Sequence, residues 1–188
     1  MLVSALAAAA PPANATWAPL QAEPVRIDCA DVPGRPYCRS TAIIGVPLAD
    51  ATRTFEELDR HQDKMGAITL VERLEADVLH VVMDYPFPLS DRDYVARFTR
   101  RTEADGTLVY AWTPIEHPAA PPTEGVVRLT WLDGEWRFAA AGAHTRLTYV
   151  WESDPGGNLP DVKAVRAKAG FLAIQDMASA CGSKILGP

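Results

Sequence analysis

Residues 84–98 read Asp-Tyr-Pro-Phe-Pro-Leu-Ser-Asp-Arg-Asp-Tyr-Val-Ala-Arg-Phe, and this stretch joins two segments that each have the composition of a β-strand. Pro86 and Pro88 cannot donate the hydrogen bonds of a sheet, so the chain must leave the sheet there. Ser90 and Asp91 supply side-chain acceptors for the free amides of a turn. The stretch therefore predicts a strand, a turn and a second strand.

The strands on either side of this turn each have an apolar face. Side chains alternate between the two faces of a strand, so residues two apart share a face. The pattern places six residues on the apolar faces: Leu79, Val81, Met83, Tyr94, Ala96 and Phe98. We expect these faces to meet a helix or a ligand.

The rest of the chain predicts more strands of an antiparallel sheet, separated by turn residues. We expect strands at 25–30, 37–46, 67–76, 77–85, 94–102, 107–115, 126–132, 135–141 and 145–153. A turn is expected at Asp133-Gly134 because Asp-Gly is common in tight hairpins. The Pro-rich segment 116–125 predicts a loop.

Two segments have helical periodicity instead. Residues 47–65 predict a helix of a few turns, in which Asp50 can accept the first free amides as a cap. Residues from Leu159 to about Cys181 predict a long helix with a broad apolar face. That face includes three residues that we expect to contact the ligand: Val165, Ala169 and Leu172. A sheet with such a helix predicts an α+β fold in which the sheet curves around the last helix.

Composition limits the classes of function. The chain has 188 residues, 48% hydrophobic and 22% charged residues, and suits one domain, which we place at 16–188. The net charge of −6 and the pI near 5.2 disfavour a nucleic-acid partner, because phosphate binding requires a basic surface.

The N-terminus has features of an export signal. Residues 1–10 are apolar and rich in alanine, and small residues that could be a cleavage site follow up to Ala15. Residues 1–15 are therefore a candidate signal peptide, and we expect a periplasmic or secreted protein, with a cytoplasmic location as the alternative. The run is too short to span a bilayer.

The cysteines bear on the same question. Cys29 and Cys38 flank an expected hairpin turn at 31–36, so they could form a disulfide in an oxidising compartment. Two free buried thiols in the cytoplasm are the alternative. Cys181 is left over and is expected in the core.

The chain shows no recognisable catalytic constellation. Its four histidines are scattered, without the spacing of metal ligands, so no metal site is expected. Arg92 and Asp93 are interpreted as residues that pin the turn. Ser90 lacks the glycines that surround a nucleophilic serine, so hydrolysis is not indicated.

Several motifs, in order along the chain, resemble the START domain, a lipid-transfer module. They are Pro86-Phe-Pro-Leu-Ser-Asp-Arg-Asp-Tyr-Val95, Asp105-Gly106, His117-Pro-Ala-Ala-Pro-Pro122 with Gly125-Val-Val-Arg128, and Leu147-Thr-Tyr-Val150 with Asp154-Pro-Gly-Gly-Asn-Leu-Pro160. The resemblance runs from about residue 37 to residue 181. It implies a helix-grip fold with an internal hydrophobic tunnel that holds one lipid-like molecule.

The resemblance also implies how such a protein works. A START domain shields a lipid from water and needs no cofactor, and we expect a monomer that contacts membrane surfaces briefly. A polyketide cyclase or aromatase of the same superfamily is the alternative, in which the tunnel is an active site with acid and base groups.

One departure from the family bears on the ligand. In the sterol-transferring animal branch, a cavity arginine faces an acidic residue on the preceding strand. The corresponding positions in this sequence are Phe98 and Leu79. The ion pair that could bind a sterol hydroxyl is therefore missing. The resemblance therefore predicts a lipid ligand without specifying a sterol.

Overall fold

The computed structural model describes residues 11, 15–32, 35–85, 89–153 and 163–188. Its strands are β1 (Ala18–Gln21), β2 (Arg26–Val32), β3 (Arg35–Ile44), β4 (Ile68–Glu75), β5 (Val78–Met83), β6 (Arg92–Thr102), β7 (Leu108–Pro114), β8 (Val127–Arg128), β9 (Leu132–Ala141), β10 (His144–Ser153) and β11 (Ile185–Gly187). Its helices are α1 (Leu48–Glu56), the short 3₁₀ helices η1 (Leu58–Arg60) and η2 (Gln62–Lys64), and α2 (Lys163–Ala180).

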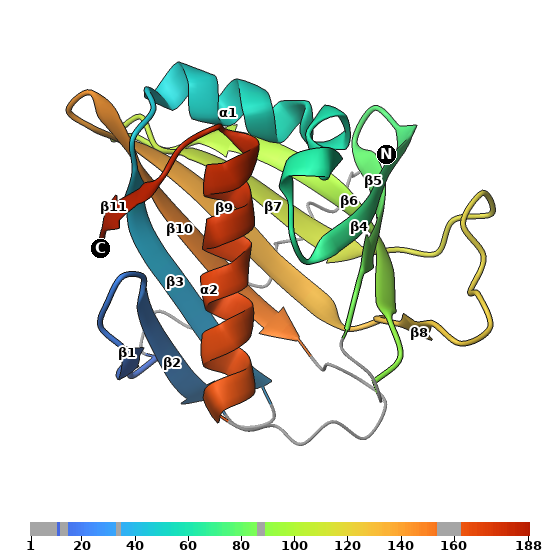
Figure 1. Ribbon diagram of the computed structural model, residues 1–188. Coiled ribbons are helices and arrows are strands. Elements are labelled where there is room, and N and C mark those ends of the chain that lie inside the picture. The colour runs from blue at the N-terminus through green and yellow to red at the C-terminus, as the bar shows by residue number, and fades with distance from the viewer. Residues whose placement is uncertain (1–10, 12–14, 33–34, 86–88, 154–162) are drawn as a thin grey trace, which may run out of the picture.

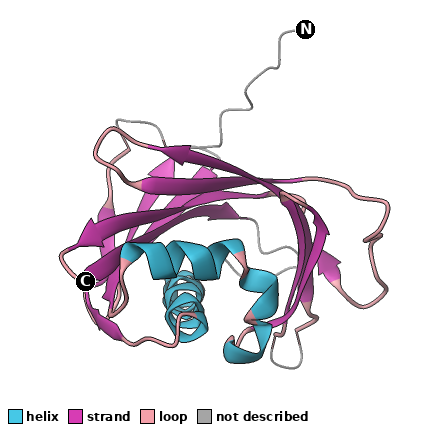
Figure 2. Ribbon diagram, turned by 90° about the horizontal axis from the view of Figure 1, so that it is seen from above, coloured by secondary structure: helices cyan, strands magenta, loops and turns pink. Residues whose placement is uncertain are grey.

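The strands form one sheet with the order β1-β2-β3-β10-β9-β7-β6-β5-β4, in which every neighbouring pair is antiparallel. The sheet curves around α2, and α1 lies across the upper end of the sheet (Figure 1, Figure 2). We call the face turned toward α2 the concave face and the opposite face the convex face. This arrangement confirms the expected α+β helix-grip fold.

The connection at 84–98 joins β5 to β6 as expected. β5 ends at Met83 and β6 begins at Arg92, and the two strands pair in antiparallel register, with Leu79 opposite Ala96. Residues 86–88, which include both prolines of the turn, lie outside the described residues.

The helix expected over 47–65 is shorter than predicted. α1 ends at Glu56, and the chain continues as η1 and η2. The side chain of Gln62 accepts a hydrogen bond from the Val71 amide at 2.9 Å and donates one to the Thr69 carbonyl, so η2 is tied to the outer edge of β4. Contacts with the sheet thus replace the helical path that local periodicity favours.

The expected cap of α1 is also wrong. Pro47 occupies the N-cap position, and no side chain there bonds to the free amides. Asp50 lies in the first helical turn and pairs with Arg53. An acidic side chain in the first turn stabilises the helix by interacting with the helix dipole, and it needs no capping hydrogen bond to do so.

The predicted turn at Asp133-Gly134 is wrong as well, because β9 runs through both residues. A Cβ atom at Gly134 would lie 2.4 Å from the Trp112 ring and from the Val150 carbonyl. The glycine therefore allows close packing within the sheet and does not form a turn. The strand expected at 126–132 is reduced to β8, which pairs in parallel with β6.

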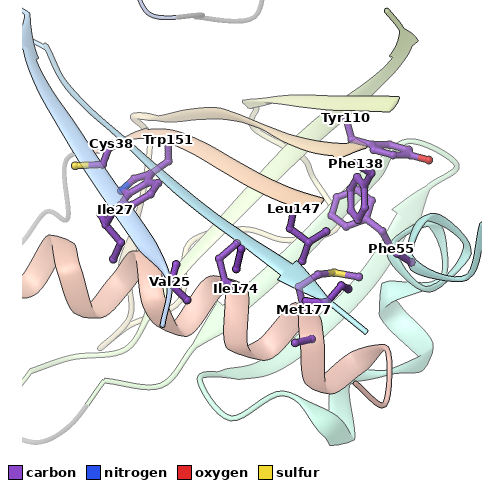
Figure 3. Close-up of a cluster of buried hydrophobic side chains, with 14 residues drawn as sticks. Val25, Ile27, Cys38, Phe55, Tyr110, Phe138, Leu147, Trp151, Ile174 and Met177 are labelled. Carbon is purple, nitrogen blue, oxygen red and sulfur yellow. The ribbon is translucent and has the colours of Figure 1, made fainter. Parts of the chain in front are cut away.

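The main core lies between α2 and the β2-β3-β10 part of the sheet. Ile174 and Met177 of α2 face Leu147 and Val25 across this layer (Figure 3), and all four side chains are buried. At Gly170 the helix approaches the sheet so closely that a Cβ atom would lie 2.3 Å from the Ser40 hydroxyl. The absence of a side chain at this position lets α2 lie directly on the sheet.

Cys29 and Cys38 face each other across β2 and β3 and form a disulfide, which confirms the expected pairing. Cys181 is a free thiol packed against the main core, and burial raises its pKa to about 11. No helix within the described part of the chain is long and apolar enough to cross a membrane.

Candidate ligand-binding site

The predicted contact residues of β5 and β6 do come together on the concave face. Five of them belong to one apolar cluster: Leu79 and Val81 are buried in it, and Met83, Tyr94 and Phe98 pack against it with part of their surface exposed. Ala96 is buried beside them, opposite Leu79 in the strand register. The alternation in the sequence thus correctly indicated which residues share this face.

An aromatic band continues this surface across the sheet. Trp112 of β7 stacks on Tyr149 of β10 with ring centroids 5.6 Å apart, and Tyr149 stacks on Trp151 at 4.8 Å. Phe98 packs beside Trp112, and Trp136 beside Tyr149. The expected strands 107–115, 135–141 and 145–153 contain these tryptophans, but nothing in the sequence indicated that they form a band. Stacked and tilted rings give a flat, apolar surface suited to a hydrocarbon skeleton.

Two tyrosines of the concave face are largely removed from water. Burial raises the pKa of Tyr94 and of Tyr149 above the ordinary tyrosine value, so both side chains lie deep in protein. Both nevertheless keep part of their surface exposed. Two partly exposed tyrosines thus belong to the otherwise apolar concave face.

The three predicted residues of α2 lie on a different helix face from the one packed on the sheet. Val165 and Leu172 are half-buried, and Ala169 is exposed. The 3.6-residue repeat puts them in line with Asp176 and Ala180. Ala180 packs in the β4-β5 cluster described above, so this helix face is turned toward that part of the sheet. Direct contact of the three residues with a ligand stays a prediction.

Asp176 fixes the position of α2 against the start of β4. Its carboxylate accepts hydrogen bonds from the Gly66 amide at 2.9 Å and the Ala67 amide at 3.2 Å. The carboxylate is buried and engaged by the backbone, so it is a structural group of the site and is not free to act on a ligand.

The Arg92-Asp93 pair of the connection is also engaged in architecture. Asp93 is buried on the convex face, where Arg128 donates two hydrogen bonds to it at 2.8 and 2.6 Å and His80 lies 2.9 Å away. Arg92 is buried, donates to the Ser90 carbonyl, and has its guanidinium 4.5 Å from the centre of the Tyr85 ring. These contacts agree with the structural role expected from the sequence.

Opposing effects set the ionisation of Asp93. Burial favours the neutral acid, but the hydrogen bonds from Arg128 and His80 favour the carboxylate and outweigh it, so the pKa of Asp93 lies below its ordinary value. The carboxylate is therefore held charged beside Arg128 of β8.

Two grooves open on the outer surface. One, of about 310 Å³, runs along the C-terminal half of α2 and is lined by Phe171, Ala178 and Ile185, among others. The other, of about 730 Å³, lies on the convex face and is lined by polar residues that include Arg39 and Arg146. Neither groove contains a predicted contact residue. Within the described ranges, no three His, Cys, Asp or Glu side chains are grouped closely enough to hold a metal ion.

Comparison with known proteins links this geometry to a family. The family model of the START domain matches residues 52–179. The chain is 37% identical over 84 residues to an uncharacterized protein of Pseudomonas aeruginosa, a match that covers 42% of this chain and 39% of that protein. It is 33% identical over 103 residues to the phosphatidylcholine transfer protein of Rattus norvegicus, which covers 52% of this chain and 48% of that protein. The matched regions span less than half the length of either relative.

Solved structures show the same fold. The StAR-related lipid transfer protein of Xanthomonas axonopodis superposes with a TM-score of 0.74 at 19% identity, over 88% of this chain and 98% of that one. An aromatase/cyclase from a Streptomyces species superposes with a TM-score of 0.50 at 17% identity, over 78% and 91% of the two chains. At these identities, the structural similarity shows the fold and nothing finer.

Proposed function

This chain belongs to the START domain family, and on that premise we propose that it binds a lipid or another hydrophobic small molecule inside the curve of its sheet and carries it without bond chemistry. The observation that carries the proposal is the partly exposed apolar and aromatic surface of the concave face. Each Å² of apolar ligand surface that this face removes from water stabilises a complex by about 25 cal/mol.

The residues of the concave face suit a passive carrier. Met83, Phe98 and Trp136 keep part of their surface exposed there. Exposed apolar surface of this kind is favourable only if a ligand covers it. A hydrophobic ligand would therefore fill the space, as in other apolar binding cavities.

The cyclase alternative requires acid and base groups that ionise near neutral pH. Two histidines lie away from the concave face. His80 is on the convex face beside Asp93, and His117, in the loop beyond β7, bonds to Glu75 of β4. The tyrosines of the concave face have raised pKa values and stay protonated at neutral pH. These observations favour carriage over acid–base catalysis.

The disulfide supports an oxidising compartment, because such bonds persist outside the cytoplasm. We therefore propose a periplasmic or secreted carrier. Fractionation of cells that produce the full chain tests this proposal: we expect the protein outside the cytoplasm with the bond formed. Reduced protein found only in the cytoplasm would contradict it.

A lipid-uptake experiment with matched variants tests carriage. Protein purified without detergent is examined for bound lipid by native mass spectrometry and is then offered pyrene-labelled lipids in vesicles. We expect a one-to-one complex in the wild type. Met83→Trp should reduce uptake at least about threefold, because the larger ring fills space on the concave face.

Val82→Trp is the control, because Val82 is the next residue of β5, is also half-buried and faces the opposite side of the sheet. It should leave uptake within a factor of two of wild type. Near-UV circular dichroism verifies that both variants fold. If folded wild-type protein neither retains nor takes up a hydrophobic molecule, the proposed function is wrong.

A further inference from the structure

The groove of about 730 Å³ on the convex face is separate from the concave face that carries the proposed function. Its charged lining consists of three arginines, Arg26, Arg39 and Arg146, and two carboxylates, Asp28 and Glu23. Three positive and two negative side chains leave an excess of one positive charge, although the whole chain has a net charge of −6. The groove is therefore a locally basic site on an acidic protein.

The strand register groups the three arginines around one pair of threonines. Thr41 of β3 lies opposite Thr148 of β10, and their hydroxyl oxygens are 3.4 Å apart. Arg26 of β2 lies opposite Thr41 on its other side. Arg39 and Arg146 are each two residues, about 7 Å, from one of the threonines along its own strand, and so lie on the same face. Long side chains from these positions can reach one ligand group above the threonines.

A buried carboxylate holds two of these arginines in place. Asp28 is 3% exposed and accepts hydrogen bonds from the Nε atoms of Arg26 and Arg39, at 3.0 and 3.2 Å. The guanidinium of Arg39 also lies 4.4 Å from the centre of the Trp17 ring. Its two NH₂ groups have no partner among the described residues, so they are available to an acceptor. A side chain that is already ordered loses less freedom when a ligand binds.

Arg146 adds a charge without a counter-ion. Its neighbours across the strands are Ile43 of β3 and Ala139 of β9, and it makes no hydrogen bond or ion pair within the part of the chain that the structure describes. Three other arginines of the convex face each bond to a carboxylate: Arg97, Arg128 and Arg137. Water would satisfy an isolated guanidinium, but this one shares a groove with two guanidinium groups that are held in position.

These groups fit the oxygens of a phosphate. A guanidinium offers parallel N–H donors that match pairs of phosphate or carboxylate oxygens. The threonine pair adds a donor, because two hydroxyls that share one hydrogen bond leave one O–H free. A carboxylate has only two oxygens, whereas a phosphate presents more and can accept from donors on several strands at once.

We propose that this groove is a second binding site, which recognises a phosphate group through Arg39, Arg146 and the Thr41–Thr148 pair. Asp28 holds the geometry. The phosphate belongs to a soluble phosphorylated compound or to the head group of a membrane lipid, and both present the same chemistry to the groove. The inference does not rest on lipid carriage, because the site lies on the opposite face of the sheet.

Titration with inorganic phosphate, followed by amide NMR at constant ionic strength, tests the site in wild-type protein. We expect the amide signals of Thr41, Arg146 and Thr148 to shift and to saturate, and those of β5 to stay in place. Glycerol phosphate should give the same shifts. Shifts that sodium chloride reproduces equally would show that the groove only attracts anions in general.

Arg146→Gln should weaken binding of phosphate about tenfold, in line with the loss of a hydrogen bond from a charged group. Arg146→Lys keeps the charge but loses the paired donors, so its affinity should lie between those of the wild type and Arg146→Gln. Arg97→Gln is the matched control, because it changes the net charge equally and Arg97 bonds to Asp77 outside the groove. It should leave the affinity within a factor of two, and near-UV circular dichroism verifies that all variants fold.

Flotation with lipid vesicles separates the two sources of phosphate. If Arg146→Gln binds phosphatidylglycerol vesicles about fivefold more weakly than the wild type does, the phosphate is that of a lipid head group. If soluble phosphates saturate the groove and the two proteins bind these vesicles equally, the ligand is a soluble compound. The inference is wrong if neither soluble phosphate nor vesicles distinguish Arg146→Gln from the wild type. It is also wrong if Arg97→Gln weakens binding as much, because net charge alone would then explain the effect.

Discussion

Asp93 holds a buried negative charge on the convex face, where Arg128 and His80 bond to it. Because its pKa is lowered in the folded protein, it contributes stability above the ordinary aspartate pKa of about 3.9. That contribution is lost as the pH falls through the lowered folded value. We therefore expect the free energy of unfolding to decrease below about pH 4, measured by urea denaturation with tryptophan fluorescence.

Asp93→Asn tests the same charge at neutral pH. The substitution leaves the largely buried Arg128 without its counter-ion, so we expect a loss of about 3 kcal/mol of unfolding free energy at pH 7. Asp77→Asn removes a carboxylate from an exposed ion pair with Arg97 and should cost less than about 1 kcal/mol. Equal losses in the two variants would show that burial of Asp93 does not matter.

Single residues illustrate what sequence reasoning can and cannot find. The bond of Arg92 to the Ser90 carbonyl was predictable, because turn residues in this pattern commonly bond to nearby backbone. The partners of Asp93 were not, since they are side chains from β5 and β8. The roles of Gly134 and Gly170 were not predictable, because each depends on a side chain from another element that comes close only in the folded protein. Asp133-Gly134 has the composition of a turn, and only tertiary packing makes it part of a strand.

Among the elements, α2 is joined to the chain before β4 by a side chain near its C-terminal end. Asp176 bonds there to the amides of Gly66 and Ala67, which precede β4. Asp176→Ala removes both acceptors, so we expect those two amides to exchange with solvent at least about tenfold faster and the protein to lose about 1–2 kcal/mol of stability. Hydrogen exchange followed by NMR measures both effects.

Asp176→Asn provides the matched comparison, since its side chain keeps one carbonyl oxygen as an acceptor. It should protect one of the two amides from exchange. Its free energy of unfolding should lie between those of the wild type and Asp176→Ala. Unchanged exchange at Gly66 and Ala67 in the alanine variant would mean that α2 is positioned by apolar packing alone.

Elements were predicted well where local pattern and tertiary packing agree. The strands around 84–98 and the last helix follow clear alternation or helical periodicity. β1 and β11 were missed because they are short and gain their pairing only from β2 and β3. The helix over 47–65 was overextended because periodicity does not reveal the bonds that tie Gln62 to β4.

At the scale of the whole molecule, the Cys29–Cys38 disulfide acts through the unfolded chain. It joins residues nine apart in the sequence, and closing a loop of that size reduces the freedom of the unfolded state by an amount worth about 2–3 kcal/mol. We expect reduction, or the double variant Cys29→Ala/Cys38→Ala, to lower the unfolding free energy by this amount. Cys181→Ala is the control for loss of a thiol, and a reduced protein as stable as the oxidised one would contradict the expectation.

The fold and the apolar wall of the site were therefore largely predictable, since both follow from alternation and from motifs in order along the chain. The aromatic band was not. Trp112 and Tyr149, whose rings stack, are 37 residues apart in the sequence, and strand β9 separates their strands in the sheet. Their relation depends on the curvature of the sheet, which no local pattern specifies.

The Gln62 side chain, which bonds to Val71 and Thr69, has a further consequence for the protein in solution. β4 is the last strand of the sheet, and its free backbone groups could recruit a strand from a second molecule. Gln62 occupies an amide and a carbonyl of that edge with its own amide group. One side chain thereby blocks part of the edge where a strand of a second molecule could pair, and the proposed carrier function would benefit from a protein that stays monomeric.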